Sequence, residues 1–236
     1  MTHRTPKNSL SFAVWGKYAL FTDPITRVGG EKCSYHVPTY EALKGITESI
    51  YWKPTFTWII DQVRIMTPIR TEAKNMKPIN INGGNSLATY TYLSNVRYQV
   101  VAHFEWNCHR KDLAHDRDEG KHFNVANRML AKGGRRDIFL GTRECQGYVE
   151  PCGFGSGPST HDAAGELGYG QMFHGFDYPD TSGKNELQAR FWQAVVKDGV
   201  ICFPRPDDEN IHRRFVREMT PHPPESVGLN EKGTLE

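Results

Sequence analysis

Apolar and polar positions alternate at the start of the chain and then change to a helical spacing. Residues 9–21 interleave aromatic and β-branched side chains with polar ones, which predicts a first strand ended by the turn-forming run Thr22-Asp23-Pro24. From Thr39, which can cap a helix, apolar side chains recur every three or four residues, and Pro54 stops the pattern. We therefore expect a helix from Thr39 to about Trp52, with an apolar face of Tyr40, Leu43, Ile46 or Thr47, and Ile50.

Two further apolar stretches predict strands. Residues 56–65 carry large apolar side chains at alternating positions and indicate a second strand. A polar connection follows, bracketed by Pro68 and Pro78 and ending at Gly83-Gly84. Residues 87–106 are rich in aromatic and β-branched side chains, and they predict either a third strand or a bent hairpin.

A second helix is expected after an acidic stretch. Asp116 or Asp118 can cap it, and Gly133-Gly134 can end it in a left-handed conformation. Residues 138–140 then supply a fourth strand. The order strand, helix, strand, strand, helix, strand within residues 9–150 is that of a ferredoxin-like (RRM-like) domain, an open antiparallel sheet with both helices on one face. The pattern thus predicts an α+β fold.

The last third of the chain differs in composition. Residues 151–170 are rich in glycine, serine and proline, which is typical of a loop or linker. Residues 171–206 contain three short strand patterns (171–176, 187–196 and 200–203) and predict a small C-terminal antiparallel β-sheet appendage. Residues 207–236 form a polar tail with few apolar side chains to offset its ordering entropy, so we expect it to be partly disordered.

Charge and cysteine usage indicate the setting of the protein. Its 29 Lys and Arg residues give a formal net charge of only +2, but basic side chains outnumber acidic ones between Arg110 and Arg143. Such a run is typical of a nucleic-acid surface or of an ordinary solvated face. The five cysteines are scattered, and no secretory leader or membrane-length apolar stretch is present, so we expect a cytoplasmic protein without membrane contacts. The cysteine and histidine spacings match no zinc site, and we expect neither a metal nor a cofactor.

Two separated segments, Tyr51-Trp52-Lys53 and Gly120-Lys121-His122-Phe123, carry the candidate chemistry. The sequence around them resembles the subtype I-C (Dvulg) CRISPR-associated proteins of the Cas-five family, which belong to the RAMP superfamily. The resemblance extends over roughly residues 10–206. The runs that carry it are 17–24, 29–32, 37–46, 48–54, 83–85, 90–93, 119–122, 133–141, 143–149, 174–176 and 203–206.

The resemblance implies both a fold and an activity. The fold is a ferredoxin-like RAMP domain, and the activity is that of a metal-independent endoribonuclease that binds the CRISPR repeat hairpin and cleaves precursor crRNA. Such a protein would remain on the mature crRNA, beside the backbone and large subunits of a type I-C surveillance complex, with double-stranded DNA as a further candidate partner. The resemblance also implies that Tyr51, Lys121 and His122 are the catalytic residues, and all three residue types match.

These side chains suit RNA cleavage without a metal, because RNA carries its own nucleophile in the 2′-hydroxyl and yields a 2′,3′-cyclic phosphate and a 5′-hydroxyl. An imidazole with an ordinary pKa of about 6.5 can shuttle protons near neutrality, which suits His122. The ammonium of Lys121 is better suited to stabilising charge on phosphorus. The phenol of Tyr51 would orient the 2′-hydroxyl or act as the base, and the sequence leaves open which of Tyr51 and His122 is the base.

The adjacency of Lys121 and His122 constrains their position. Successive residues of a regular helix point about 100° apart, so these two side chains cannot both reach one phosphate from a helix interior. We therefore expect them in the loop or first turn at the start of the second helix. There the unpaired amides and the positive end of the helix would also face the phosphate.

Basic and aromatic side chains are the candidates for RNA binding, since cations can hold backbone phosphates while a ring stacks on a base. Arg135 and Arg136, beside Gly133-Gly134, are the favoured pair. The full set is Trp52, Lys53, Lys74, Lys77, Arg135 and Arg136.

Two other functions also fit the sequence. Related Cas-five proteins of other subtypes resemble this chain in architecture but do not cut the transcript, which suggests a non-catalytic subunit that binds the crRNA 5′ handle. The second alternative is a metal-dependent DNase. Its acids would be Asp112, Asp116, Asp118 and Glu119, which can equally cap the second helix.

Overall fold

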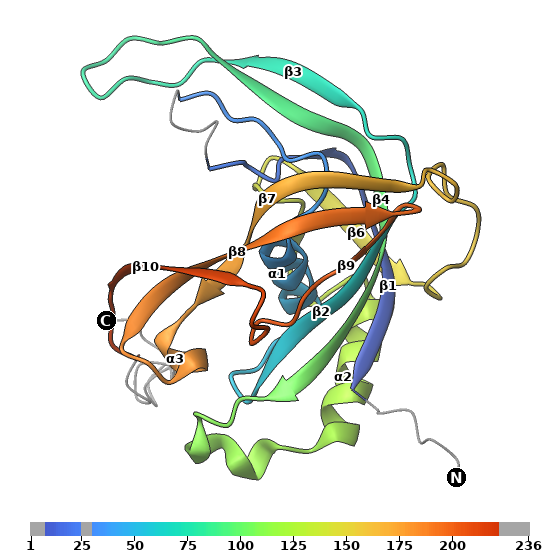
Figure 1. Cartoon of the computed structure of the whole chain (residues 1–236), viewed down its shortest axis with the longest axis vertical. Coiled ribbons are helices and arrows are strands. Elements are labelled where there is room, and N and C mark those ends of the chain that lie inside the picture. Colours follow the sequence, from blue (N-terminus) through green and yellow to red (C-terminus); the bar gives the residue numbers. More distant parts are fainter. Residues whose placement is uncertain (1–7, 25–29, 222–236) are drawn as a thin grey trace.

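A large sheet and two helices that pack on it organise the chain (Figure 1). The computed structural model describes residues 8–24 and 30–221. Within these residues the elements are β1 (Ser9–Ala19), α1 (Tyr40–Ile50), β2 (Phe56–Ile65), β3 (Thr71–Met76), β4 (Ala88–Trp106), the 3-10 helix η2 (Lys111–Asp116), α2 (Glu119–Ala131), β5 (Ile138–Phe139), β6 (Gln146–Pro151), β7 (Glu166–Asp177), α3 (Pro179–Ser182), β8 (Glu186–Lys197), β9 (Val200–Cys202) and β10 (His212–Glu218).

Hydrogen bonds join ten strands into one sheet in the order β10-β8-β9-β2-β4-β1-β6-β5, with β3 also paired to β4 and β7 to β8. The pairings between these strands are antiparallel. At the centre, Val100 of β4 lies opposite Phe12 of β1 on one side and Val63 of β2 on the other. The fold is therefore a mixed α/β one with a mostly antiparallel sheet.

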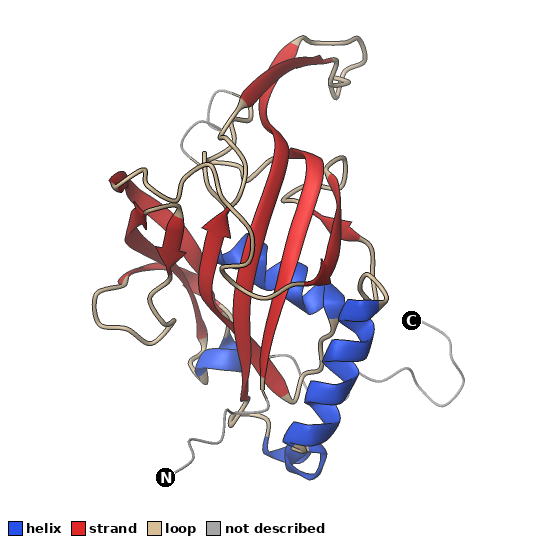
Figure 2. Cartoon of the chain, turned by 90° about the vertical axis from the view of Figure 1, so that its right-hand side faces the viewer, coloured by secondary structure: helices blue, strands red, loops and turns tan. Residues whose placement is uncertain are grey.

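Both long helices pack against the sheet, and Figure 2 shows α1 passing behind its long strands and α2 beside them. α1 contacts β2, β5, β7 and α2, and α2 contacts β1 and β6. Every second residue of β4 faces this layer, and the core includes Val96, Tyr98, Val100, Ala102 and Phe104. The caps follow the sequence pattern: Thr39 Oγ1 accepts a hydrogen bond from the Ala42 amide at 3.2 Å, and the Asp118 side chain caps α2.

Two details of the central strands differ from the sequence predictions, and one open alternative is decided. The polar connection between Pro68 and Pro78 contains β3, whose mostly exposed side chains give no apolar alternation, so that backbone pairing with β4 forms the strand. Residues 88–106 form one long strand and not a hairpin. The strand beside β1 is β6, and not the strand expected at residues 138–140. Those residues contribute only the two-residue β5, which pairs with the other edge of β6.

The C-terminal strands are longer than expected and continuous with the main sheet. β7 begins at Glu166, inside the expected linker, and β9 pairs with β2 through Ile201 and Val63. The predicted appendage is therefore joined by hydrogen bonds to the central sheet. Part of the expected polar tail forms the strand β10, which pairs with β8. Residues 222–236 of that tail lie outside the described residues.

The glycine-rich segment before β7 is tied to β2 and β4 by side-chain hydrogen bonds. Arg64 of β2 donates to Asp162 at 2.6 Å, and Gln99 of β4 donates to the Ser156 carbonyl oxygen at 2.6 Å. The first of these hydrogen bonds joins two charged groups, which makes it stronger than a bond between neutral groups. The segment is a loop that lies against the sheet.

The five cysteines are free thiols. Within residues 8–24 and 30–221, no helix has the length and apolar character needed to cross a membrane.

Gly141, in the turn after β5, gives a test of the fold. Its backbone is left-handed (φ 95°), and a Cβ atom there would collide with the Leu20 carbonyl group. We expect Gly141→Ala to lower the free energy of unfolding by more than about 1 kcal/mol, measured by urea unfolding. Gly133→Ala is the matched control, because Gly133 also has a positive φ (86°), but no atom of the described residues would lie within 4 Å of a Cβ there. Equal losses at the two glycines would contradict the collision.

Candidate active site

Tyr51 is fixed at the end of α1. Its amide donates to the Thr47 carbonyl at 3.1 Å, which makes it the C-cap of the helix, and its carbonyl oxygen accepts from the indole of buried Trp58 at 2.7 Å. The side chain is buried, with 3% of its surface exposed. Backbone bonds on both sides therefore fix the position of the phenol.

His122 lies in the first turn of α2, as the adjacency of Lys121 and His122 predicted. Its ring is completely buried and lies among the aromatic rings of Phe56, Trp106 and Phe104, at centroid distances of 5.2, 5.8 and 6.3 Å. Lys121, the preceding residue, points outward, and 53% of its side chain is exposed. The two neighbours therefore diverge even in the first turn, and the expectation that this position would bring both side chains to one phosphate is wrong.

The fold joins Tyr51 to His122 across 71 residues of sequence. Tyr51 Oη lies 2.9 Å from His122 Nδ1, and His122 Nε2 lies 2.7 Å from the Asp116 carbonyl oxygen. Because a carbonyl oxygen can only accept, Nε2 carries a hydrogen, and in the neutral ring the Nδ1 lone pair accepts from the Tyr51 hydroxyl. A proton that His122 exchanges in this arrangement therefore passes through Tyr51.

Asp116 is the residue that sequence reasoning missed. Its carboxylate pairs with the Lys121 ammonium, accepts from Thr55 Oγ1 at 2.8 Å, and has its second oxygen 3.4 Å from His122 Nε2. In the sequence it belongs to an acidic run assigned to helix capping. Its position five residues before Lys121 is the one feature of the sequence that suggests a pairing with that lysine. The cap itself is Asp118, whose Oδ1 accepts the Lys121 amide at 2.9 Å, so that amide is not free for a phosphate.

The charges around the pair shift three pKa values. The hydrogen bond between Lys121 and Asp116 raises the pKa of the lysine and lowers the pKa of the carboxyl. Burial raises the pKa of Tyr51, with a further increase from Asp116 that Lys121 and Arg135 oppose. At neutral pH the site therefore holds an ammonium, a carboxylate and a protonated phenol.

Four of the six RNA-binding candidates lie at this end of α1. Trp52 and Lys53 follow Tyr51 directly and are exposed. Arg135 and Arg136 are exposed too, and their amides donate to the Ser49 carbonyl oxygen at 3.1 and 3.0 Å. Loop 133–136 is thus hydrogen-bonded to the helix that carries Tyr51.

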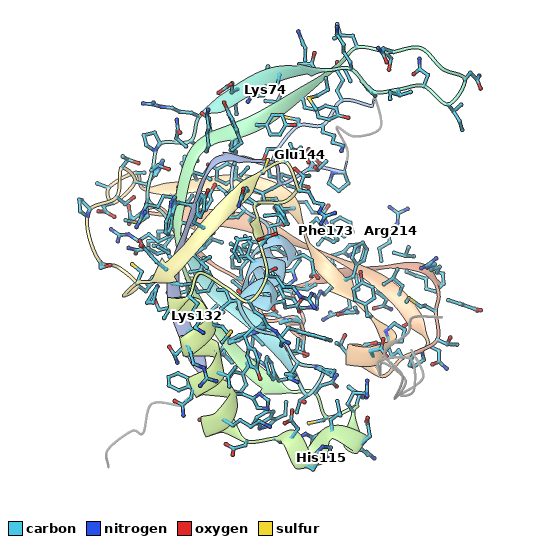
Figure 3. All side chains as sticks on the ribbon, turned by 180° about the vertical axis from the view of Figure 1, so that it is seen from behind. Lys74, His115, Lys132, Glu144, Phe173 and Arg214 are labelled. Atoms are coloured by element: carbon cyan, nitrogen blue, oxygen red, sulfur yellow. The ribbon has the colours of Figure 1, made fainter. Side chains whose placement is uncertain are left out.

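Lys74 and Lys77 are not part of this group. Lys74 lies on β3 with its ammonium 3.4 Å from the ring centre of Tyr18, and Lys77 follows the same strand. Figure 3 places Lys74 at one end of the molecule and His115, shortly before α2, at the other. Any contact of these lysines with RNA would be remote from Tyr51.

The acidic run before α2 does not converge on one point. Asp112 pairs with Arg110 at 2.7 Å, Asp116 pairs with Lys121, and Asp118 caps α2. Among the described residues, no group of three or more His, Cys, Asp or Glu side chains could hold a metal ion.

Comparison with known proteins identifies the family. A family model described as CRISPR-associated protein (Cas_Cas5) matches residues 9–204. The chain belongs to this family. Among its curated Cas5 relatives, the CRISPR pre-crRNA endoribonuclease Cas5d of Thermus thermophilus is 28% identical over 228 residues, covering 86% of this chain and 95% of that protein. The protein of the same name from Mannheimia succiniciproducens is 27% identical over 229 residues, covering 84% and 95%.

Solved structures resemble this Cas5 family member over most of its length. A crystal structure of a CRISPR-associated protein superimposes with a TM-score of 0.72 and 36% identity, covering 86% of this chain and 96% of the other. The functionally uncharacterized protein SMU1763c from Streptococcus mutans gives 0.67 and 38% with the same coverage. Family membership confirms the resemblance inferred from the sequence, and the assignment to subtype I-C is consistent with it.

Proposed function

We propose that this Cas5 family protein is a metal-independent endoribonuclease that cleaves CRISPR precursor RNA at the repeat hairpin. The observation that carries the proposal is the hydrogen bond of 2.9 Å between Tyr51 and His122. The Asp116 carboxylate links this pair to Lys121, because it lies close to the imidazole and also pairs with the Lys121 ammonium. The names of the two curated relatives support the same activity.

The proton path follows from the tautomer of His122. As the 2′-oxygen bonds to phosphorus, its proton passes to Tyr51 Oη, and the Tyr51 proton passes to His122 Nδ1. The resulting imidazolium is stabilised by the Asp116 carbonyl and carboxylate oxygens. The P–O5′ bond breaks, and the 5′-oxygen leaves with a proton, for which the exposed Lys121 ammonium is the donor. The same ammonium stabilises the charge that develops on the phosphate.

Fold and binding surface fit the same function. The central unit β1-α1-β2-β4-α2-β6, with the spatial order β2-β4-β1-β6, supports a ferredoxin-like RAMP domain over residues 9–150, whose sheet the C-terminal strands β7 to β10 continue. Trp52, Lys53, Arg135 and Arg136 form the RNA surface beside Tyr51. We further propose that the protein stays on the mature crRNA as a subunit of a cytoplasmic type I-C surveillance complex with backbone and large subunits.

One experiment tests the reaction class and the nucleophile together. Purified protein is incubated in EDTA with its repeat RNA and, in parallel, with the same RNA carrying a single 2′-deoxy nucleotide at the cut. We expect cleavage of the first RNA to a 2′,3′-cyclic phosphate and no cleavage of the second. Binding without cleavage would support the 5′-handle-binding subunit instead, and cleavage of plasmid DNA only without chelator would support the metal-dependent DNase.

Asp116 provides a pH test of the Lys121 ammonium. Asp116→Asn removes the carboxylate that raises the pKa of Lys121, so Lys121 should lose its proton at a lower pH in the variant. We expect the alkaline decline of the cleavage rate to begin at lower pH, measured from pH 8 to 11 with spontaneous RNA hydrolysis subtracted.

Asp118→Asn is the control for that test, because it removes a nearby negative charge while asparagine still caps α2. We expect the alkaline decline of the cleavage rate to shift less in Asp118→Asn than in Asp116→Asn. An unchanged alkaline limb in Asp116→Asn would show that the ammonium of Lys121 does not limit the reaction.

A further inference from the structure

A groove runs along α1 and begins beside the catalytic pair. It consists of two adjoining cavities of about 230 and 340 Å³ that share Lys44, Thr57, Asn107 and Thr181 in their walls. The smaller cavity is lined by Trp52 and the larger by Tyr40. The helix rises 1.5 Å per residue, so the ten steps from Tyr40 to Ile50 span roughly 15 Å. The groove thus has room for more than one nucleotide.

One face of α1 forms the wall of this groove. Tyr40, Lys44 and Glu48 recur at four-residue spacing, which places them in a row on the helix surface, and Trp52 follows the helix end. The opposite wall comes from the end of β4 and from α3, including Asn107 and Thr181.

The smaller cavity lies one aromatic ring away from the proposed reaction centre. Phe56 lines it, and the centre of the Phe56 ring is 5.2 Å from that of His122 and 5.7 Å from that of Tyr51. A nucleotide in this cavity would therefore be a close neighbour of the scissile phosphate.

The walls of the smaller cavity suit a flat ring. Trp52 is 39% exposed, and with Pro54 and Phe56 it supplies apolar surface, while Asn107 and Arg110 add polar groups. Aromatic side chains stack on unpaired bases in a sequence-tolerant way.

In the larger cavity the cations are already paired with acids. Arg190 bonds Asp177 at 2.8 Å and Arg205 bonds Glu105 at 2.9 Å, so the charges balance and a bare phosphate gains little there. Among the described residues, the buried Nε of Arg190 in its wall has no hydrogen-bond partner. A neutral ring with an acceptor on its edge would supply such a partner.

We propose that this groove binds unpaired nucleotides next to the scissile phosphate, with one base stacked on Trp52 and the next between α1 and α3. The proposal rests on the function proposed above, because it takes RNA as the substrate. It assigns the specificity of cleavage to bases outside the hairpin stem, read along α1.

The test uses repeat RNAs that each carry one abasic nucleotide, scanned across the positions on both sides of the cut. Each RNA also carries a 2′-deoxy nucleotide at the cut, so that binding is measured without cleavage. We expect one or two consecutive abasic positions to weaken binding to the wild-type protein by roughly ten- to hundredfold, the value of a lost base stack.

Two variants assign that loss to the groove. Trp52→Ala removes the stacking ring, and Thr181→Trp fills the space shared by both cavities. Each should bind the abasic and intact RNAs within about twofold of each other. Thr160→Trp, an exposed position in the loop on β2 and β4, should keep the wild-type difference.

The outcomes separate this proposal from the nuclease. Binding that no abasic position weakens, or a loss that persists in both groove variants, would overturn the groove while leaving cleavage of natural RNA untouched. Failure of wild-type protein to cut natural repeat RNA in EDTA would overturn the nuclease, and the abasic scan would still report on the groove.

Discussion

Replacing His122 with alanine is expected to slow repeat cleavage by about two to four orders of magnitude while leaving repeat binding intact. The imidazole is completely buried, so its loss removes no surface that RNA could contact. What it removes is the only described acceptor for the Tyr51 hydroxyl, at 2.9 Å. Single-turnover cleavage and gel-shift measurements on the same preparation check both parts of the prediction.

Tyr51→Phe is the conservative companion of this variant, because it deletes one oxygen and keeps the ring. If the phenol and the imidazole act as one relay, Tyr51→Phe should lose a comparable factor, and the double variant should lose little more than either single one. His115→Ala is the matched histidine control: His115 is exposed near the start of α2, and within residues 8–24 and 30–221 its ring bonds only the Asp112 carbonyl oxygen. It should stay within about twofold of wild type.

Two results would contradict the relay. Full cleavage by His122→Ala would remove the imidazole from the mechanism, and additive losses in the double variant would mean that the two side chains act separately. Circular dichroism of each variant guards against misfolding, since alanine at a fully buried ring position leaves a cavity.

The parts of the fold that bury an apolar face were predictable. α1 and β2 appear within one or two residues of their expected limits, because a regular apolar spacing and a capping Thr39 mark them. β3 and β10 were not predictable, since their exposed side chains follow no alternation and their pairing depends on backbone bonds to β4 and β8. β6 was missed because its main inward-facing apolar side chain is Val149 alone.

The candidate site was predictable in its residues but not in its arrangement. The first-turn position of Lys121 and His122 was predictable, but it was expected to bring both side chains to one phosphate, and in the structure one is buried and the other points outward. The bridging position of Asp116 depends on where η2 ends relative to α2, which no sequence spacing states. Likewise, the separation of Lys74 from Tyr51 depends on how far β3 and the start of β4 extend from the rest of the sheet.

The second large effect that we expect is a fall in the free energy of unfolding in acid. His174 of β7 is completely buried and stacks on Tyr40 of α1, with ring centres 4.0 Å apart. Its Nε2 donates to the Pro204 carbonyl at 3.0 Å, so a second proton must go to Nδ1, which is buried and has no hydrogen-bond partner in the part of the chain that the structure describes. Burial and the nearby Arg190 lower the pKa of His174 to about 3.

The sign of the pH dependence follows from that shift. An unfolded histidine takes up its proton near pH 6.5, but folded His174 resists until about pH 3, so stability present above pH 6.5 is lost as the pH falls. The loss is about 1.4 kcal/mol per pH unit, or roughly 2 kcal/mol at pH 5. Urea unfolding from pH 4.5 to 7.5, followed by tryptophan fluorescence, measures it.

His174→Gln keeps a donor near the Pro204 carbonyl but does not titrate, so its free energy of unfolding should fall less steeply in acid than that of the wild type. His103→Gln is the matched comparison. Asp61 and Glu105 raise the pKa of His103, so its contribution is fully present below pH 6.5 and is lost as pH rises through the raised value. His103→Gln should therefore lower the free energy of unfolding by a constant amount below pH 6.5 and keep the wild-type acid slope there. Two buried or half-buried histidines on one sheet thus oppose each other, and equal acid slopes in both variants would contradict the burial of an unpartnered Nδ1 between α1 and β7.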